Sequence, residues 1–270
     1  FIKNESSNPL GRFSVGTPRT SDGSLLFLQH MISKMESKGS RIGIVFNGSP
    51  LFTGDSGSGE SEIRKWIIEN DWLECIVSLP TKLFFNTGIN TYVWIVSNKK
   101  SDKRKGKVQL INGSSFCKST RKNLGDKSNY IDDISREKIL DIYLNNIEGE
   151  HSIVFPNSHF GYTKVTIEQP LLDDDGNIIT DRQGNPKPNS KKRDYERIPL
   201  DQDIEDYYDK EVKPHLPNSW MDRNKDKVGY EINFTKYFYQ YKPLRSLEDI
   251  TQDLLELDEQ IGGTMKDILD

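Results

Sequence analysis

The residues with the clearest potential for chemistry are three closely spaced glycines, Gly54, Gly57 and Gly59, which precede an expected helix. Glycine-rich turns at helix N-termini bind phosphate groups. However, no Gly-Lys-Ser/Thr sequence follows these glycines, and no Gly-x-Gly-x-x-Gly sequence opens an expected helix. The sequence therefore excludes a Walker phosphate loop and gives no dinucleotide fingerprint.

Motifs for metals and nucleophiles are also missing. The chain has no His-Glu-x-x-His pattern, no Cys-x-x-Cys pair and no serine nucleophile elbow. Residues 173–177 have the acidic spacing of a calcium loop, but Gly184 stands where the closing acidic ligand belongs. Asp175-Gly176 is more typical of a hairpin turn. We therefore predict no metal site.

One asparagine stands where ligands often bind. Asn47 and the loop to Asp55 follow an expected strand, and α/β sheets bind ligands outside the carboxyl ends of their strands. This position fits either the border of a ligand pocket or a plain connecting loop.

Composition limits the class of protein. The 270 residues include 37 Lys and Arg against 41 Asp and Glu, for a formal net charge of −4. Any contact with DNA must therefore come from a local patch. Cys75 and Cys117 are predicted to be unpaired, which fits a reducing cytoplasm. No apolar run is long enough to cross a bilayer, and because the chain begins at Phe1 we expect a fragment.

The elements that would position a site predict an α/β fold. Apolar, β-branched runs indicate strands over residues 41–47, 73–79 and 90–97. A helix with a buried stripe begins near Ser58, between the first two strands. Strand, helix and strand form the unit of a parallel sheet. The return to residues 90–97 is too short for another crossover, so we expect an antiparallel strand there, at the sheet's edge.

Further elements are predicted from the spacing of apolar residues. His30 is expected to pack within its helix rather than to act as a ligand. The aromatic-rich segment 229–241 alternates and is expected to be extended. The remaining predictions are helices over residues 24–35, 134–146 and 204–212, and strands over residues 108–112 and within 155–171.

A dense basic run covers residues 98–107. It fits a solvated turn between two strands. Alternatively, Lys99, Lys100 and Arg104 contact DNA phosphates, each cation neutralising one charge.

The last segment, residues 246–269, carries apolar residues at three- and four-residue spacing. Such a narrow seam needs a partner helix. The partner is either the chain's own domain or another subunit in a coiled-coil or bundle contact. The seam consists of Leu247, Ile250, Leu254, Leu257, Ile261 and Ile268.

Four stretches in this order resemble the modification subunit of type I restriction–modification systems, a family of adenine-N6 DNA methyltransferases. They are DGSLLFLQHM at 22–31, GIVFNGSPLF at 43–52, GSGESEIRKW at 57–66 and LFFNTGI at 83–89. The resemblance continues through residues 159–162, 169–171 and 229–241, so it covers most of the chain.

Two family motifs have no match here. The glycine-rich S-adenosylmethionine loop is not present, and Asn8-Pro9-Leu10 lacks the second proline and the aromatic ring of the catalytic Asn-Pro-Pro-Phe/Tyr. The resemblance places the true motif upstream of Phe1. The resemblance implies that this chain is the C-terminal portion of the subunit. Such a portion would contain no catalytic residue, bind no cofactor and be inactive alone. The implied segments are 1–171 from the methyltransferase domain, an irregular extension at 172–245, and a subunit-contact helix at 246–270.

For the complete subunit, the resemblance implies methyl transfer from S-adenosylmethionine to an adenine flipped out of double-stranded DNA. The implied partners are a specificity subunit and a restriction subunit. Phe84, or failing it Phe85, is expected to stack on the flipped base, against the alternative of an ordinary buried phenylalanine. Asn47 would border the base pocket. A non-catalytic assembly or DNA-binding module is the alternative function, and the strand at 41–47 is expected to promote self-association.

Overall fold

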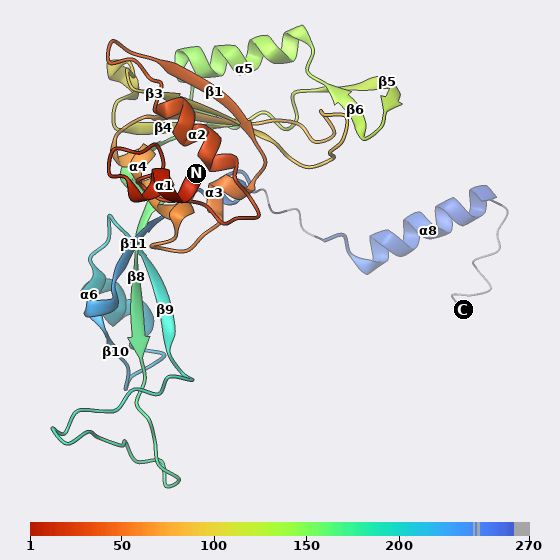
Figure 1. Ribbon diagram of the computed structural model, residues 1–270. Helices are drawn as coiled ribbons and strands as arrows, with labels where there is room; N and C mark the ends of the chain where they lie inside the picture. The colour runs from red at the N-terminus through yellow and green to blue at the C-terminus, as the bar shows by residue number, and fades with distance from the viewer. Residues whose placement is uncertain (240, 242–243, 262–270) are drawn as a thin grey trace. The chain divides into compact units, whose positions relative to one another are not determined.

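The computed structural model describes residues 1–239, 241 and 244–261, and it divides into two compact units, Phe1–Phe234 and Thr235–Asp270 (Figure 1). The first unit holds the eleven strands of the described residues. The division into segments 1–171, 172–245 and 246–270 stays a prediction. In the described residues, no helix is both long and apolar enough to span a membrane.

A five-stranded mixed sheet forms the centre of the first unit. Its order is β1-β3-β2-β4-β7, with β3 antiparallel to both neighbours, β2 parallel to β4, and β7 antiparallel to β4. The strands are β1 (Arg41–Phe46), β3 (Tyr92–Ser97), β2 (Leu73–Ser78), β4 (Lys107–Asn112) and β7 (Ser152–Pro156).

The α/β class and the single sheet containing the three predicted strands are confirmed, and so is the antiparallel direction of residues 90–97. The predicted edge position of that segment is wrong. β3 lies between β1 and β2, and the side chain of its Trp94 is fully buried, as is typical of an inner strand. A short return fixes the direction of a strand relative to its predecessor, but not what pairs with its other side. The antiparallel edge strand is β7.

Helices cover both faces of this sheet. On one face, Ile139, Ile142 and Tyr143 of α5 (Asp133–Asn145) pack against a cluster that includes Cys75 and Val77. Figure 1 shows α2 (Ser24–Ile32) and α4 (Gly59–Glu69) on the other side. α4 begins where Ser58 Oγ accepts a hydrogen bond from Ser61 N, an N-cap. The predicted buried stripe of α4 is therefore confirmed, since Ile63 and Ile67 are fully buried.

A second, smaller sheet follows. β8 (Gly161–Glu168) pairs on one side with β9 (Asp194–Pro199) and on the other with β10 (Trp220–Met221) and β11 (Lys227–Tyr230), all antiparallel. Its core contains Val165, Ile167 and Ile198, covered by Tyr208 and Val212. The strand predicted within 155–171 and the helix predicted at 204–212 are confirmed. The extended prediction for 229–241 is wrong beyond β11, because residues 234–237 form a helical turn, α7.

Two matching turns occupy the long connection between β8 and β9. Asp173 Oδ1 accepts hydrogen bonds from the backbone N–H groups of residues 175 and 177. Asp181 Oδ1 accepts the same pair eight residues later, from residues 183 and 185. Gly176 and Gly184 adopt φ of +84° and +87° at the corners, a conformation that favours glycine. The predicted turn at Asp175-Gly176 is confirmed.

The remaining elements belong to neither the central sheet nor the second sheet. His30, on α2, contacts the Arg12 guanidinium through Nδ1 at 2.9 Å. The other helices and strands are α1 (Ile2–Ser7), α3 (Ser49–Phe52), η1 (Asp102–Arg104), β5 (Lys118–Leu124), β6 (Lys127–Tyr130), η2 (Asn157–Phe160), α6 (Ile204–Tyr207), η3 (Tyr208–Val212), η4 (Arg223–Lys225), α7 (Phe234–Tyr237) and α8 (Leu247–Ile261).

The second unit contains α8, which confirms the predicted terminal helix as far as residue 261. Leu247, Ile250, Leu254 and Leu257 of the seam all have exposed side chains. The side chain of Ile261 and all of Ile268 lie outside the described residues. The subunit contact through this seam stays a prediction.

Candidate nucleic-acid interface

The loops that follow β1 and β2 leave the same edge of the central sheet. Phe46, which ends β1, and Ser78, which ends β2, both pair with Tyr92 at the start of β3. Residues 47–58 and 79–91 therefore begin side by side at the carboxyl ends of two strands. This is the edge where α/β sheets bind ligands.

Asn47 stands at the start of the first of these loops and is exposed. Its Oδ1 accepts a hydrogen bond from Ser49 N at 3.0 Å, which starts the short helix α3. The asparagine therefore has a local structural task at the sheet edge. A role beside a base pocket stays a prediction. Asn8, in the stretch that departs from the catalytic motif, is exposed at the end of α1, and its Oδ1 accepts a hydrogen bond from Leu10 N at 3.0 Å.

The loop after β2 exposes two aromatic rings. Leu83 anchors the loop by packing on the cluster that includes Cys75 and Val77. The next two side chains are partly exposed to solvent, Phe84 to 38% and Phe85 to 57%. Phe84 is therefore not an ordinary buried phenylalanine, which was the alternative interpretation. An exposed ring at a ligand-binding edge is available for stacking.

The basic run lies at the opposite end of the sheet, beyond the last residue of β3 and before β4. Lys99 is exposed and donates from Nζ to the carbonyl oxygen of Lys38 at 3.1 Å. The structure therefore does not bring the basic run together with Phe84 or Asn47. The basic run is therefore not part of a site at the sheet edge that carries Phe84 and Phe85.

Lys100 is buried and paired within this run. Its Nζ lies 2.6 Å from Asp71 Oδ1 and donates to the carbonyl oxygen of Lys107 at 2.8 Å. Burial lowers the pKa of the Lys100 ammonium, and Asp71 opposes that shift. Burial alone would raise the pKa of Asp71, but the hydrogen bonds from Lys100, Gly106 N and Asn157 outweigh it and lower the pKa. Lys100 cannot reach a phosphate without breaking this pair.

Arg104 is buried in a second polar group. Its Nε lies 3.4 Å from Glu74 Oε1, and its guanidinium also donates to Gln109 Oε1 at 3.1 Å and to the carbonyl oxygen of Tyr143. These contacts tie η1 to β2, β4 and α5. The basic run suggested that Arg104 is either solvated or in contact with DNA, whereas its side chain is buried and paired within the protein.

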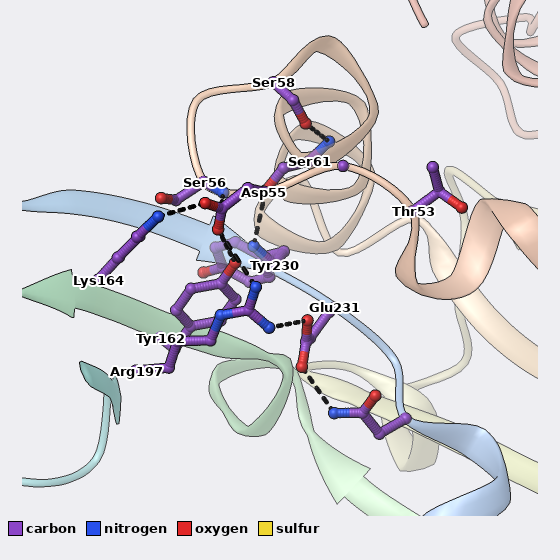
Figure 2. Close-up of polar contacts among 12 residues, drawn as sticks. Thr53, Asp55, Ser56, Ser58, Ser61, Tyr162, Lys164, Arg197, Tyr230 and Glu231 are labelled. Carbon is purple, nitrogen blue, oxygen red and sulfur yellow. Dashed lines mark hydrogen bonds and ion pairs between the residues drawn. The ribbon is translucent and has the colours of Figure 1, made fainter. Parts of the chain in front are cut away.

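An ion-pair network surrounds Asp55, in the loop between α3 and α4 (Figure 2). Its carboxylate accepts from Lys164 Nζ of β8 and from Arg197 of β9 at 3.3 Å. Arg197 also pairs with Glu231 at 2.8 Å. Burial alone would raise the pKa of Asp55, but Lys164, the N–H of Ser56 and the charge of Arg197 together lower it. The network fastens the loop at the sheet edge to the second sheet.

Arg64 of α4 holds the same loop from below the surface. The side chain is fully buried and donates to four backbone carbonyl oxygens: Tyr230 at 2.6 Å, Thr53 at 2.8 Å, Pro50 at 3.1 Å and Gly54 at 3.2 Å. Burial lowers its pKa to about 10, so it stays charged at neutral pH. One guanidinium thus fixes the path of residues 50–54 against β11.

A pocket of about 400 Å³ opens beside the Asp55 network. Its lining includes Lys164, Lys225 and Lys227. Lys164 is paired with Asp55, and Lys225 with Glu168 at 2.9 Å. Most of the positive charge in the lining is therefore neutralised within the protein.

The Asp55 network and the role of Arg64 do not follow from the sequence. Asp55 is separated from its partners by 109 and 142 residues. No local spacing pattern connects such residues. The only local indication was a charged residue, Arg64, among the buried residues of α4 beside Ile63 and Ile67.

The fold defines a methyltransferase-like α/β protein. The structure is similar to that of the type I restriction–modification system methyltransferase subunit from Streptococcus thermophilus, with a TM-score of 0.50 and 25% sequence identity. The match covers 57% of this chain and 31% of that chain.

The chain belongs to the N-6 DNA methylase family, whose model matches residues 2–190. It is 39% identical over 108 residues to the Type I restriction enzyme HindI methylase subunit of Haemophilus influenzae, covering 40% of this chain and 23% of that protein. It is 31% identical over 132 residues to the Type I restriction enzyme MjaIX methylase subunit of Methanocaldococcus jannaschii, covering 49% and 22%. The matches thus span less than a quarter of each curated relative.

Proposed function

We propose that the chain is part of a site-specific DNA adenine-N6 methyltransferase subunit of a type I restriction–modification system, and that it contributes the side that holds the base. The proposal is supported most directly by Phe84, an exposed ring at the carboxyl edge of the sheet, within the segment that the family model matches. The reaction is methyl transfer from S-adenosylmethionine to the amino group of a flipped adenine.

Two of the three glycines at residues 54–59 do not form a cradle for the methyl donor. A Cβ on Gly59 would collide with the carbonyl oxygen of Thr17, and one on Gly54 would collide with Ser58 and Glu60, so the protein itself fills the space beside these two glycines. We therefore derive no step through the donor and assign no catalytic residue to this chain.

The proposed contribution of this chain is to hold and orient the target base. A base that has left the helix stack loses its neighbours, and an aromatic face replaces part of that stacking. Phe84 supplies this face and Phe85 is the second candidate. Stacking of one base is worth about 1–3 kcal/mol, so removing the ring should slow transfer by roughly 5- to 150-fold.

The test uses Phe84→Ala in the complete methyltransferase, with incorporation of labelled methyl groups into duplex DNA as the measurement. Phe27→Ala is the matched control, because Phe27 is 69% exposed and lies on α2, outside the loop of residues 79–91 that carries Phe84. We expect a loss with Phe84→Ala and none with Phe27→Ala. Transfer at the wild-type rate by a correctly folded Phe84→Ala variant would remove the stacking role.

Assembly with specificity and restriction subunits is proposed to use α8. Its support is the row of exposed apolar side chains, from Leu247 at 82% exposed to Leu257 at 53% exposed. The same row favours the second candidate function, a non-catalytic assembly module. Pull-down with a specificity subunit, with and without residues 246–270, tests this contact, and equal recovery of both forms would count against it.

Calorimetry with S-adenosylmethionine should show no binding to the 270-residue chain, and tight binding would refute our placing of the donor site elsewhere.

A further inference from the structure

The hairpin β5–β6 is joined to the aromatic loop by main-chain hydrogen bonds. Asp126 N donates to the carbonyl oxygen of Phe85, and Ser128 N and Asn129 N both donate to that of Lys82, each at 3.1 Å. Asn129 Nδ2 donates to the carbonyl oxygen of Thr81 at 3.0 Å. A two-stranded hairpin is marginally stable by itself. These bonds make the hairpin and the loop one structural piece.

Lys82 adopts a backbone conformation that suits this junction. Its φ is +55°, which residues other than glycine rarely adopt. The strained turn directs its carbonyl oxygen to two donors of β6. Such strain concentrates at functional sites and persists where the surroundings enforce it. Here it sets the hairpin directly beside Phe84 and Phe85 in the structure.

The hairpin carries four basic residues and one acidic residue between 118 and 130. Lys118 pairs with Asp132 at 2.7 Å. Lys127 Nζ lies 5.0 Å from the centre of the Phe85 ring, within cation–π range. Arg121 and Lys122 are exposed, and no ion pair within the described residues neutralises either of them.

Arg121 and Lys122 occupy an irregular part of the hairpin. The register of β5 against β6 shifts between Ser119 and Leu124. A bulge of this kind breaks the alternation of side chains and redirects them. The two adjacent cations are therefore not confined to opposite faces of a regular strand.

Cations beside exposed aromatic rings suit nucleic acid better than a protein partner. Arg and Lys bind phosphates, and the ring faces accept bases. The cores of protein–protein interfaces are instead depleted of Lys. The piece formed by loop 81–85 and the hairpin combines both nucleic-acid elements, while the overall charge of −4 gives no general attraction.

We propose that β5–β6 is a DNA-backbone-binding arm, in which Arg121 and Lys122 bind phosphates that flank the nucleotide held at Phe84. The choice of DNA as the nucleic acid rests on the proposed function. The phosphate-binding role rests on the geometry and charge of the hairpin. Two phosphate contacts contribute about 1.8 to the slope of log K against log salt.

The experiment compares the wild-type chain with Arg121→Gln/Lys122→Gln by fluorescence anisotropy on a labelled duplex over a salt series. The double variant should lower the slope by about 1.8, with affinity about ten- to sixtyfold weaker at 0.1 M salt. Arg182→Gln/Lys187→Gln is the matched control, since it removes one exposed Arg and one exposed Lys from the connection between β8 and β9. We expect less than a twofold change for the control.

Three results would overturn the inference: wild-type affinity in the hairpin variant, an equal loss in the control, or no salt-dependent binding by the wild-type chain. Thermal unfolding at the wild-type temperature would show that the variants remain folded. The outcome is separable from the proposed function. Failure of the hairpin variant to change binding, together with impaired methyl transfer by Phe84→Ala, rejects the arm alone. Unimpaired transfer by Phe84→Ala rejects the base-holding role instead.

Discussion

Replacing Arg64 by methionine removes a side chain that joins the loop at residues 50–54 to α4 and β11. Methionine keeps a similar length and has a good helix propensity, so the substitution removes donors and charge with little change in packing. Four backbone carbonyl oxygens lose their donor: those of Pro50, Thr53, Gly54 and Tyr230.

The expected loss follows from two opposing effects. Hydrogen bonds to a charged donor contribute about 1.5–3 kcal/mol each, so four at the lower limit stabilise the fold by about 6 kcal/mol. Burial acts against the charged guanidinium, and the lowered pKa of Arg64, about 10, corresponds to a cost of about 3 kcal/mol. The net loss in Arg64→Met should therefore be about 3 kcal/mol. Arg64→Lys, which keeps a charge and fewer donors, should lose less.

Urea unfolding followed by tryptophan fluorescence measures the effect, because Trp66 and Trp72 pack edge-to-face with ring centres 4.9 Å apart beside the same helix. Lys65→Met is the matched control on the neighbouring, half-buried position, and its stability should change by less than about 0.5 kcal/mol. A loss below about 1 kcal/mol in Arg64→Met, with an unchanged m value, would refute the argument. It would mean that water or other donors satisfy the four carbonyl groups.

Two further predictions concern titratable groups. The pKa of Asp55 is lowered, so its ion pairs with Lys164 and Arg197 stabilise the fold above the ordinary carboxyl pKa of 3.8, and this contribution disappears as pH falls through the lower folded value. Asp55→Asn should therefore lower the free energy of unfolding by less than about 1 kcal/mol at pH 7, since the carboxylate is partly exposed. Urea unfolding at pH 3 should show a smaller difference in this free energy between the variant and the wild type. An undiminished difference would exclude the charge of Asp55 as the cause. Burial raises the pKa of the Cys75 thiol, whereas Cys117 is partly accessible. A thiol reagent should label Cys117 first in the native chain and Cys75 only after unfolding, and equal labelling would contradict the packed core around Cys75.

The periodic elements could be predicted from the sequence because their cause is local. Ile63 and Ile67 repeat at helical spacing, and the run at residues 73–79 is apolar and β-branched, so each pattern specifies its own element. The unpaired state of both cysteines is likewise confirmed. Sheet order depends instead on which strand covers which edge. That is why the inner position of β3 did not follow from the short return.

The site was predictable only where a residue is simply exposed. Phe84 follows a strand and precedes another, and its position at the sheet edge follows from the direction of β2. The buried state of Lys100 depends on Asp71, 29 residues away, and that of Arg104 on Glu74. Net charge and local runs of lysine do not reveal such pairs. The Asp55 network combines three elements that meet only in the folded chain.

The position of β3 also bears on how the chain reaches its fold during synthesis. Within the described residues, β1 pairs with β3 alone, with Arg41 opposite Ser97 and Phe46 opposite Tyr92. Among the described residues, the partner of β1 is therefore complete only after about fifty more residues have been made. Non-local pairing of this kind slows folding and leaves an apolar strand open to aggregation. Nascent chains that stop before residue 97 should be the ones that depend most on chaperones.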